Sequence, residues 1–251
     1  MLRIILSGAC GRMGRELTQA LTPTLHRIVA GVDVCPADAS PFPVYPSFSM
    51  IVEAADVLID FSRPEALLPL LDFAVARRLP VVLAATGYNE ADLAAVSRAA
   101  LRIPVFQSAN MSIGVYALRR LAEQAKALLP GFDIEIVEKH HNQKLDAPSG
   151  TAMMLYHAVK NADSVPVYGR CTRTEKREPT EIGLHAVRGG TLAGEHEIGF
   201  YGNGEALLIT HSAQGRAIFA DGALRAASFI VAQSPGLYSM DDLAAALAAS
   251  K

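Results

Sequence analysis

A short segment, residues 138–151, concentrates side chains that can exchange protons and bind an anion. His140 and His141 are adjacent imidazoles that can titrate near neutral pH, and Lys144 adds a positive charge. The segment ends on Gly150 and Thr151, where a helix is expected to start, and the N–H groups at a helix start favour a carboxylate. The pattern therefore predicts a site at which an anionic substrate receives a proton.

Two other interpretations of this segment remain open. Adjacent histidines can simply be polar residues at the end of a strand. His140, His141 and Asp146 are also plausible metal ligands, but their spacing matches no zinc motif, so no metal ion is predicted.

The amino terminus carries the pattern of a dinucleotide-binding loop. An apolar strand is expected at residues 2–7, and Gly8, Gly11 and Gly14 then lead into a helix that continues to residue 21. Glycines at such a turn let the backbone approach a pyrophosphate, which lies at the helix N-terminus. Cys10 occupies the position of the second glycine in the commoner motif. An ordinary strand–turn–helix unit is the alternative.

The end of the next expected strand, residues 26–32, bears on the cofactor. Asp33 follows it directly and is placed to bind the hydroxyls of an adenosine ribose. A 2′-phosphate usually requires a nearby arginine, and residues 34–36 supply none, although Arg12 in the glycine loop could reach a phosphate. We therefore expect NADH and/or NADPH as cofactor, with NADH slightly favoured.

The composition limits the class of protein. The 251 residues are 51% hydrophobic and 19% charged, which is typical of a compact soluble protein, and the formal net charge of −2 argues against nucleic-acid binding. Three cysteines, Cys10, Cys35 and Cys171, lack metal spacing and suit a reducing cytosol. No apolar run approaches the roughly 18 residues of a membrane span, and the first residues lack a signal-peptide pattern. We expect a cytoplasmic protein with no membrane partner.

Apolar runs and helical periodicity alternate through the first hundred residues. Strands are expected at 56–61, 80–85 and 104–107, and helices at 67–75 and 90–101. Ser62 is expected to cap the helix start that contains Pro64. Repeated βα units predict a Rossmann-type, doubly wound parallel sheet, with ligands bound beyond the carboxyl ends of its strands.

The pattern then changes to that of a second, α+β domain. A helix at 113–128, a strand at 132–137 and a helix at 152–159 surround the histidine segment. Extended runs at 182–187, 196–201 and 206–211, separated by glycine turns, predict a mixed or antiparallel sheet. Residues 170–180, dense in charge, are expected to be a mobile loop.

The last helices, 217–232 and 240–248, are expected to pack back against the nucleotide-binding part of the chain. The predicted domains are therefore 1–112 with 217–251 for the dinucleotide, and 113–216 for substrate binding and oligomerisation.

Several motifs together resemble one enzyme family. They are residues 8–14 (GACGRMG), 59–65 (IDFSRPE), 108–114 (SANMSIG), 194–196 (GEH), 219–223 (FADGA) and, above all, 138–151 (EKHHNQKLDAPSGT). The chain resembles the 4-hydroxy-tetrahydrodipicolinate reductases, also called dihydrodipicolinate reductases, of diaminopimelate and lysine biosynthesis. The resemblance runs nearly end to end. It implies that a reduced nicotinamide nucleotide reduces a cyclic imine dicarboxylate, with loss of water, to tetrahydrodipicolinate.

The resemblance also implies roles for individual residues. His140 and Lys144 would handle the proton, with Lys144 the donor, while His141, Gly150 and Thr151 would bind the substrate. The cofactor would be held by Gly8, Ala9, Cys10, Gly11, Arg12, Met13, Asp33, Ala84, Ala85, Thr86, Ser108, Ala109, Asn110 and Met111. The family resemblance further implies a homotetramer assembled through the sheet of the second domain.

Two positions depart from the family pattern. Ala84-Ala85-Thr86-Gly87 stands where the family commonly has Gly-Thr-Thr-Gly, so one hydroxyl contact near the nicotinamide is lost. Met111 replaces an aromatic residue, which keeps bulk but not ring stacking.

Two other functions remain as alternatives. An aspartate dehydrogenase-like enzyme would share the nucleotide domain but would not need the histidine–lysine segment. A nicotinamide-nucleotide-binding module without catalysis would bind the cofactor and turn over no imine substrate.

Overall fold

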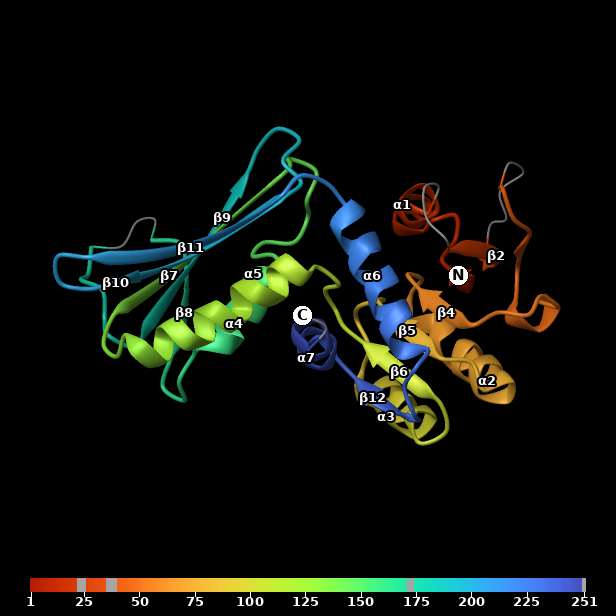
Figure 1. Ribbon diagram of the computed structural model, residues 1–251. Helices are drawn as coiled ribbons and strands as arrows, with labels where there is room; N and C mark the ends of the chain where they lie inside the picture. Colours follow the sequence, from red (N-terminus) through yellow and green to blue (C-terminus); the bar gives the residue numbers. More distant parts are fainter. Residues whose placement is uncertain (22–25, 35–39, 171–173, 250–251) are drawn as a thin grey trace. The chain divides into compact units, whose positions relative to one another are not determined.

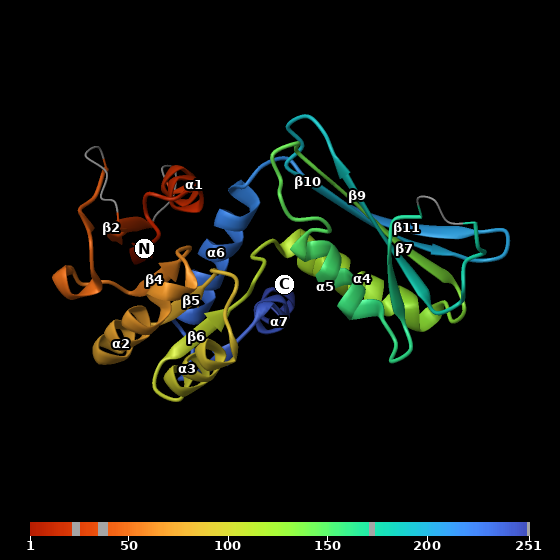
Figure 2. The same cartoon turned by 180° about the vertical axis from the view of Figure 1, so that it is seen from behind.

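The computed structural model describes residues 1–21, 26–34, 40–170 and 174–249 (Figures 1 and 2). Cys35 and Cys171 therefore lie outside the described residues. The chain divides into two compact units. The first unit contains Met1–Ile113 and Arg216–Lys251, and the second contains Gly114–Gly215. Each unit is described by itself.

The first unit is built on a seven-stranded sheet in the order β12-β6-β5-β4-β1-β2-β3, in which every pairing is parallel. The strands are β1 (Arg3–Ser7), β2 (Arg27–Val32), β3 (Val44–Tyr45), β4 (Val57–Asp60), β5 (Val81–Leu83), β6 (Pro104–Gln107) and β12 (Gly236–Tyr238). The strand order reverses at β1, which lies between β2 and β4. This confirms the predicted Rossmann-type sheet and places its switch point beside the glycine loop.

Helices cover both faces of this sheet. They are α1 (Arg12–Ala20), α2 (Leu67–Arg77), α3 (Glu90–Ala100), α6 (Ala217–Ile230) and α7 (Met240–Ala249), with short 3-10 turns η1 (Phe48–Met50) and η2 (Pro64–Ala66). α2 and α3 pack together on one face, whereas α6 lies over β4, β5 and β6 on the other face and contacts α1 (Figures 1 and 2). Consecutive residues of β1, Ile4 to Leu6, are fully buried because both faces are covered.

The second unit pairs two helices with a five-stranded sheet. The helices are α4 (Ile113–Leu128) and α5 (Gly150–Val159), and the strands are β7 (Asp133–His140), β8 (Val165–Tyr168), β9 (Glu181–Arg188), β10 (Gly194–Tyr201) and β11 (Ala206–Ala213). The order is β11-β10-β7-β9-β8. β10 pairs antiparallel with β7 and β11, whereas β9 pairs parallel with β7 and β8, so the sheet is mixed.

The two faces of this mixed sheet differ. Ile134, Ile136, Ile198 and Phe200 point to the face that packs against α4 and α5 and forms the core of the unit. Side chains alternate along a strand, so their neighbours point to the opposite face. We call this the outer face, and it carries Glu135, Val137, Lys139, His185, Val187, Glu195, Tyr201 and Leu208.

The structure corrects two local expectations. β7 does not end at Val137 but continues to His140, because Glu138 to His140 keep their register with β9 and β10 and find charged partners there. Ser62 does not cap a helix: its hydroxyl donates to Asp60 Oδ1 at 2.5 Å, Arg63 precedes η2, and α2 begins only at Leu67.

Other segments were not anticipated. The short strands β3, β8 and β12 lie at sheet edges and carry little hydrophobic alternation of their own. In the segment expected to be mobile, Arg170 and Arg177 both donate to Glu135 Oε1, while residues 171–173 lie outside the description. Across the described ranges, no helix combines the length and apolar character needed to cross a membrane.

Candidate functional site

The glycine loop lies at the carboxyl end of β1 and brings the backbone close to its neighbours. Gly8 has a φ of +76°, and a Cβ there would lie 2.8 Å from the carbonyl of Phe61. A Cβ on Gly14 would lie 2.4 Å from the carbonyl oxygens of Gly8 and Ala9. Both positions therefore require glycine, as a close-packed strand–turn–helix unit does.

The first turn of α1 is suited to hold an anion. Its N-cap residue is Gly11, which has no side chain, and no side-chain hydrogen bond caps the helix. The first N–H groups of a helix have no partner within it, so these groups of α1 can bind a phosphate.

Asp33 is brought to the same loop. It follows β2, and its Oδ2 accepts a hydrogen bond from the N–H of Cys10 at 2.9 Å. The carboxylate thus lies beside the expected pyrophosphate cradle, where a ribose would be. The glycine cradle, the uncapped helix start and this carboxylate together fit a dinucleotide.

Two further loops end at this carboxyl edge of the sheet. Residues 84–86 follow β5, and residues 108–111 follow β6. Ser108 donates to the carbonyl of Asn110 at 2.7 Å, and Asn110 Oδ1 accepts from the N–H of Ser112 at 2.9 Å, so the second loop is held by its own side chains. Met111 is 2% exposed, and the absence of a Cβ at Gly222 lets α6 approach its carbonyl.

Asp60 is a buried carboxyl beneath this edge to which the sequence analysis gave no role. It is 1% exposed at the end of β4 and accepts hydrogen bonds from the hydroxyls of Ser62 and Tyr88, at 2.5 Å and 3.3 Å. Burial raises its pKa, although these hydrogen bonds oppose the shift. Asp60 holds the turn at Phe61 and Ser62 against which Gly8 packs.

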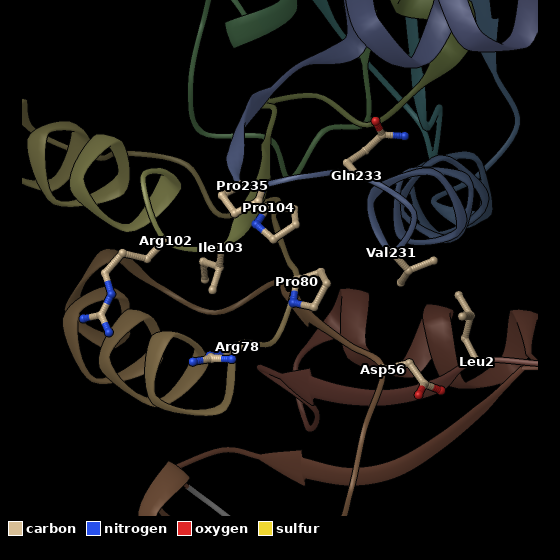
Figure 3. Close-up of a pocket in the computed structure, with 10 residues that line it drawn as sticks. All are labelled: Leu2, Asp56, Arg78, Pro80, Arg102, Ile103, Pro104, Val231, Gln233 and Pro235. Atoms are coloured by element: carbon tan, nitrogen blue, oxygen red, sulfur yellow. The ribbon is translucent and has the colours of Figure 1, made fainter.

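A hollow of about 600 Å³ opens elsewhere on the first unit (Figure 3). Its lining residues are Leu2, Asp56, Arg78, Pro80, Arg102, Ile103, Pro104, Val231, Gln233 and Pro235. Leu2, Asp56 and Pro80 precede β1, β4 and β5, so the hollow lies at the amino ends of the strands, away from the glycine loop. It therefore contains none of the predicted cofactor residues.

In the second unit, His140 lies at the end of β7 and is largely buried, with 8% exposed. Its Nδ1 lies 2.5 Å from Oε2 of Glu138, which is fully buried. Burial lowers the pKa of His140, and the hydrogen bond and charge of Glu138 offset this only in part. Burial would raise the pKa of Glu138, but hydrogen bonds from Arg188 and His140 hold it below its usual value.

The loop after β7 carries His141 and Lys144. The N–H of His141 donates to the carbonyl of Leu192 at 2.8 Å, and the N–H of Lys144 donates to the carbonyl of His141 at 3.2 Å. Lys144 Nζ lies 2.8 Å from Asp146 Oδ1, and the pKa of Asp146 is lowered by this hydrogen bond. The ammonium group is thus held near the strand end that carries His140.

The loop ends at the start of α5. Ser149 is the N-cap, and its hydroxyl oxygen accepts from the N–H of Ala152 at 3.1 Å. Gly150 and Thr151 form the first turn, and a Cβ on Gly150 would meet nothing within 4 Å. This helix start has open space at Gly150 and the positive end of the helix dipole, which suits a carboxylate.

His196 completes the cluster from β10. Its Nε2 lies 2.8 Å from Ser149 Oγ, and its ring meets that of His140 edge to face, with centroids 5.1 Å apart. Burial, together with the charge of His140, lowers the pKa of His196 to about 4, so it is neutral at pH 7. A neutral imidazole here adds no charge that would compete with Lys144.

The predicted residues are thus brought together in two sets. The predicted cofactor residues lie in the first unit. The second unit contains His140 at the end of β7, His141 and Lys144 in the loop after it, and Gly150 and Thr151 at the start of α5. The sequence analysis missed the roles of Glu138, Arg188 and His196. The GEH motif at residues 194–196 pointed to His196, but no sequence motif pointed to Arg188.

Within the described ranges, no three His, Cys, Asp or Glu side chains cluster in a way that could hold a metal ion.

Comparison with known proteins covers nearly the whole chain. Residues 2–111 match the family description "Dihydrodipicolinate reductase, N-terminus", and residues 114–244 match "Dihydrodipicolinate reductase, C-terminus". The chain is 49% identical to the 4-hydroxy-tetrahydrodipicolinate reductase of Caldanaerobacter subterraneus, over 97% of this chain and 98% of the relative. It is 45% identical to that of Staphylococcus epidermidis, over 96% of this chain and all (100%) of the relative.

Solved structures show the same architecture. The dipicolinate-bound dihydrodipicolinate reductase of Paenisporosarcina sp. TG-14 is 25% identical, with a TM-score of 0.76 over 95% of this chain and 97% of that one. An amine dehydrogenase from Mycobacterium smegmatis, 9% identical with a TM-score of 0.65 over 96% of this chain and 95% of that one, shares the fold alone. Given the match of both domains and of close relatives over their full length, the chain belongs to the dihydrodipicolinate reductase family.

Proposed function

We propose that this chain reduces 4-hydroxy-tetrahydrodipicolinate to tetrahydrodipicolinate with a reduced nicotinamide nucleotide, in the diaminopimelate route to lysine. One observation supports the proposal: in a member of this family, His140 at the end of β7, Lys144 in the loop after it and the start of α5 lie within one short segment, and these groups can donate a proton and bind a carboxylate. The names of its relatives, such as that of Caldanaerobacter subterraneus, specify the same reaction.

The residues of the second unit divide the work on the substrate. A carboxylate binds the N–H groups of Gly150 and Thr151 and the Thr151 hydroxyl, at the positive end of the α5 dipole. His141 contacts the substrate from the loop. Lys144 donates the proton, and His140 exchanges it through Nε2, because Nδ1 is engaged by Glu138.

The first unit holds the cofactor. When bound there, a reduced nicotinamide would supply the hydride. The net change would be gain of one hydride and one proton by the substrate and loss of one water. Gly8 to Met13 bind the pyrophosphate and Asp33 the adenosine ribose, while Ala84 to Thr86 and Ser108 to Met111 line the nicotinamide. We favour NADH over NADPH because the Asp33 carboxylate lies beside the glycine loop and residues 34–36 supply no arginine for a 2′-phosphate.

The outer face of the second unit supports a homotetramer. Leu208 and Tyr201 are 51% and 39% exposed there, and Val187, which is 49% exposed, lies next to the Lys139–Glu195 pair. Exposed apolar side chains on one sheet face are consistent with an interface. We place the protein in the cytoplasm, where nicotinamide nucleotides and the products of lysine biosynthesis are available.

A coupled assay tests the function. The substrate is generated in situ from pyruvate and aspartate semialdehyde by the upstream synthase, and absorbance of the reduced nicotinamide is followed with NADH and NADPH in parallel. Rapid loss of absorbance is expected, faster with NADH at equal concentration. Binding of both cofactors without oxidation would instead support a non-catalytic nucleotide-binding module, and oxidation only with an open-chain imino acid would support an amino-acid dehydrogenase.

A further inference from the structure

Two charged residues, the buried Glu138 and the partly exposed Arg188, connect the segments that carry His140 and Lys144. Glu138 is fully buried on β7, and Arg188 ends β9 at the register position of His140. The guanidinium donates to Oε1 and Oε2 of Glu138, each at 2.7 Å. A bidentate pair has one favoured geometry, and loss of the guanidinium would leave the buried Glu138 carboxylate without this charge partner.

The Glu138 carboxylate reaches two parts of the site. Its Oε2 is the partner of His140 Nδ1, and its Oε1 accepts from the N–H of Ser149 at 3.0 Å. The first contact favours the imidazole tautomer with a proton on Nδ1, so that Nε2 is the nitrogen that exchanges a proton. The second contact ties the start of α5 to the same carboxylate.

Arg188 reaches the loop that carries Lys144. Its Nη2 also donates to the backbone carbonyl of Asp146 at 2.6 Å. The side chain of Asp146 in turn accepts from Lys144 Nζ at 2.8 Å. Arg188 therefore contacts both Glu138, which is the partner of His140, and Asp146, which is the partner of Lys144.

Gly194 on β10 limits where the His140 ring can lie. It precedes Glu195, which pairs with Lys139 of β7, and a Cβ on Gly194 would lie 2.9 Å from His140 Nε2. Its backbone φ of +158° also favours glycine. The ring is thus confined between Glu138 at Nδ1 and the backbone of Gly194 near Nε2.

We propose that Glu138 and Arg188 are positioning residues that orient both proton-handling side chains at once, Glu138 through His140 Nδ1 and Arg188 through Asp146. The inference deepens the proposed function, on which it rests for the roles of His140 and Lys144. Neither residue needs to touch the substrate for this role, because each acts through a neighbour.

The charges that face His140 determine what each substitution does. Glu138 from β7 favours the protonated ring, whereas Lys144 from the loop and Arg188 from β9 disfavour it. His196 from β10 faces the ring edge to face and is neutral at pH 7. Removing the Glu138 charge therefore leaves only cationic neighbours, and His140 becomes harder to protonate.

The tautomer of His140 is measured first, in the unliganded wild-type protein. Long-range 1H–15N spectra of protein labelled at histidine nitrogen are assigned by the signals lost in His140→Asn. A protonated Nδ1 and an unprotonated Nε2 are expected above the pKa of His140. A proton on Nε2 would overturn the proposal. This measurement needs no turnover, so it tests the role of Glu138 even if the protein does not catalyse the proposed reaction.

Two variants then separate the two residues. Glu138→Gln should lower the pKa of His140 by about one unit or more and shift the corresponding limb of the kcat profile to lower pH. Arg188→Lys keeps the charge beside Glu138 but cannot bind it and the Asp146 carbonyl together, so kcat should fall about 10- to 100-fold with the His140 tautomer retained. KM for the reduced nicotinamide should not change in either variant.

Glu123→Gln is the matched control, because Glu123 pairs with Arg119 on α4 in the same unit. It should leave the His140 spectrum and kcat unchanged. A Glu138→Gln protein whose His140 pKa and pH profile equal those of wild type would overturn the role of Glu138. Unchanged kcat in Arg188→Lys would overturn that of Arg188.

Discussion

At the scale of single residues, Lys144 is the side chain on which the proposed proton transfer most directly depends. It is the cation of the loop between β7 and α5, and its Nζ lies 2.8 Å from Asp146 Oδ1. Lys144→Ala should lower kcat by about 10²- to 10⁴-fold, since a general acid and a charge partner of the substrate are both removed. Steady-state rates with the in situ substrate provide the measurement.

The control for Lys144→Ala is Lys160→Ala, an exposed lysine at the carboxyl end of α5. Lys160→Ala should retain wild-type kcat. Binding of NADH, followed by fluorescence, should survive in both variants because the predicted cofactor residues belong to the first unit. Near-wild-type turnover of Lys144→Ala would exclude the role of Lys144 as donor.

His196 makes stability depend on pH. Its pKa is lowered to about 4 in the folded protein, against 6.5 for an ordinary histidine. The unfolded chain therefore binds more protons between pH 6.5 and 4, and the free energy of unfolding falls as the pH is lowered through this range. The full loss from this one group is about 3 kcal/mol.

Urea unfolding at pH 7 and pH 5 measures this contribution. His196→Gln keeps an acceptor for Ser149 Oγ but cannot be protonated, so the difference in unfolding free energy between the two pH values should shrink. His157→Gln, a change at an exposed histidine of α5, should leave the difference as in wild type. An unchanged pH dependence in His196→Gln would show that His196 is not buried in its neutral form.

At the scale of elements, the glycine loop is where a single methyl group has the largest expected effect. Gly14→Ala would bring a Cβ to 2.4 Å from two carbonyl oxygens and push α1 away from β1. The affinity for NADH should fall at least about tenfold, and unfolding should become about 1–3 kcal/mol easier. Fluorescence titration and urea unfolding measure the two effects.

Gly215→Ala is the control for this substitution, because a Cβ there meets nothing within 4 Å. It should change neither quantity. If Gly14→Ala bound NADH as tightly as wild type, the loop would not be the pyrophosphate cradle.

The elements also show what the sequence could and could not predict. The buried strands of the first unit and helices such as α4 followed from apolar runs and helical periodicity, and α4 spans the predicted residues 113–128. The end of β7 did not, because Glu138, Lys139 and His140 are polar and so resemble a loop. They form a strand because Arg188 and Glu195, from two neighbouring strands, neutralise their charges.

The candidate site, like the fold, was predictable only where its residues lie close together in the sequence. His140, Lys144 and Gly150 lie within one short segment, so their proximity followed from the sequence. Arg188 lies 50 residues from Glu138 and meets it only through the parallel pairing of β7 and β9. No local pattern contains that pairing, and neither Arg188 nor the neutral state of His196 could be inferred without the sheet.

At the scale of the whole molecule, the second unit is an insertion into the first. The chain leaves the parallel sheet after β6, forms the second unit, and returns through α6, which lies against β4, β5 and β6. The first unit is therefore completed only by the last part of the chain, including β12 beside β6. Truncation before α6 would remove a helix whose residues Ala220, Ala223 and Ala227 are fully buried.

The outer face of the second unit carries the last prediction, that of a homotetramer. Its apolar side chains Val187 and Leu208 are about half exposed in the single chain, and Glu135 is already neutralised there by Arg170 and Arg177. A partner could cover this face without burying an unpaired Glu135 charge, which would otherwise be costly. Light scattering coupled to size-exclusion chromatography should therefore give about four times the chain mass of 26.7 kDa.

Leu208→Glu should lower that mass, because association would bury a new carboxylate without a partner. Leu101→Glu is the matched control: Leu101 is 81% exposed, belongs to the first unit and is not part of the outer face, so this change should leave the tetramer intact. If Leu208→Glu forms a smaller assembly and still binds NADH, the glycine loop binds its cofactor without the tetramer. That result is expected of a cofactor site contained in the first unit. A wild-type monomer, or a Leu208→Glu tetramer, would mean that this face does not join the subunits.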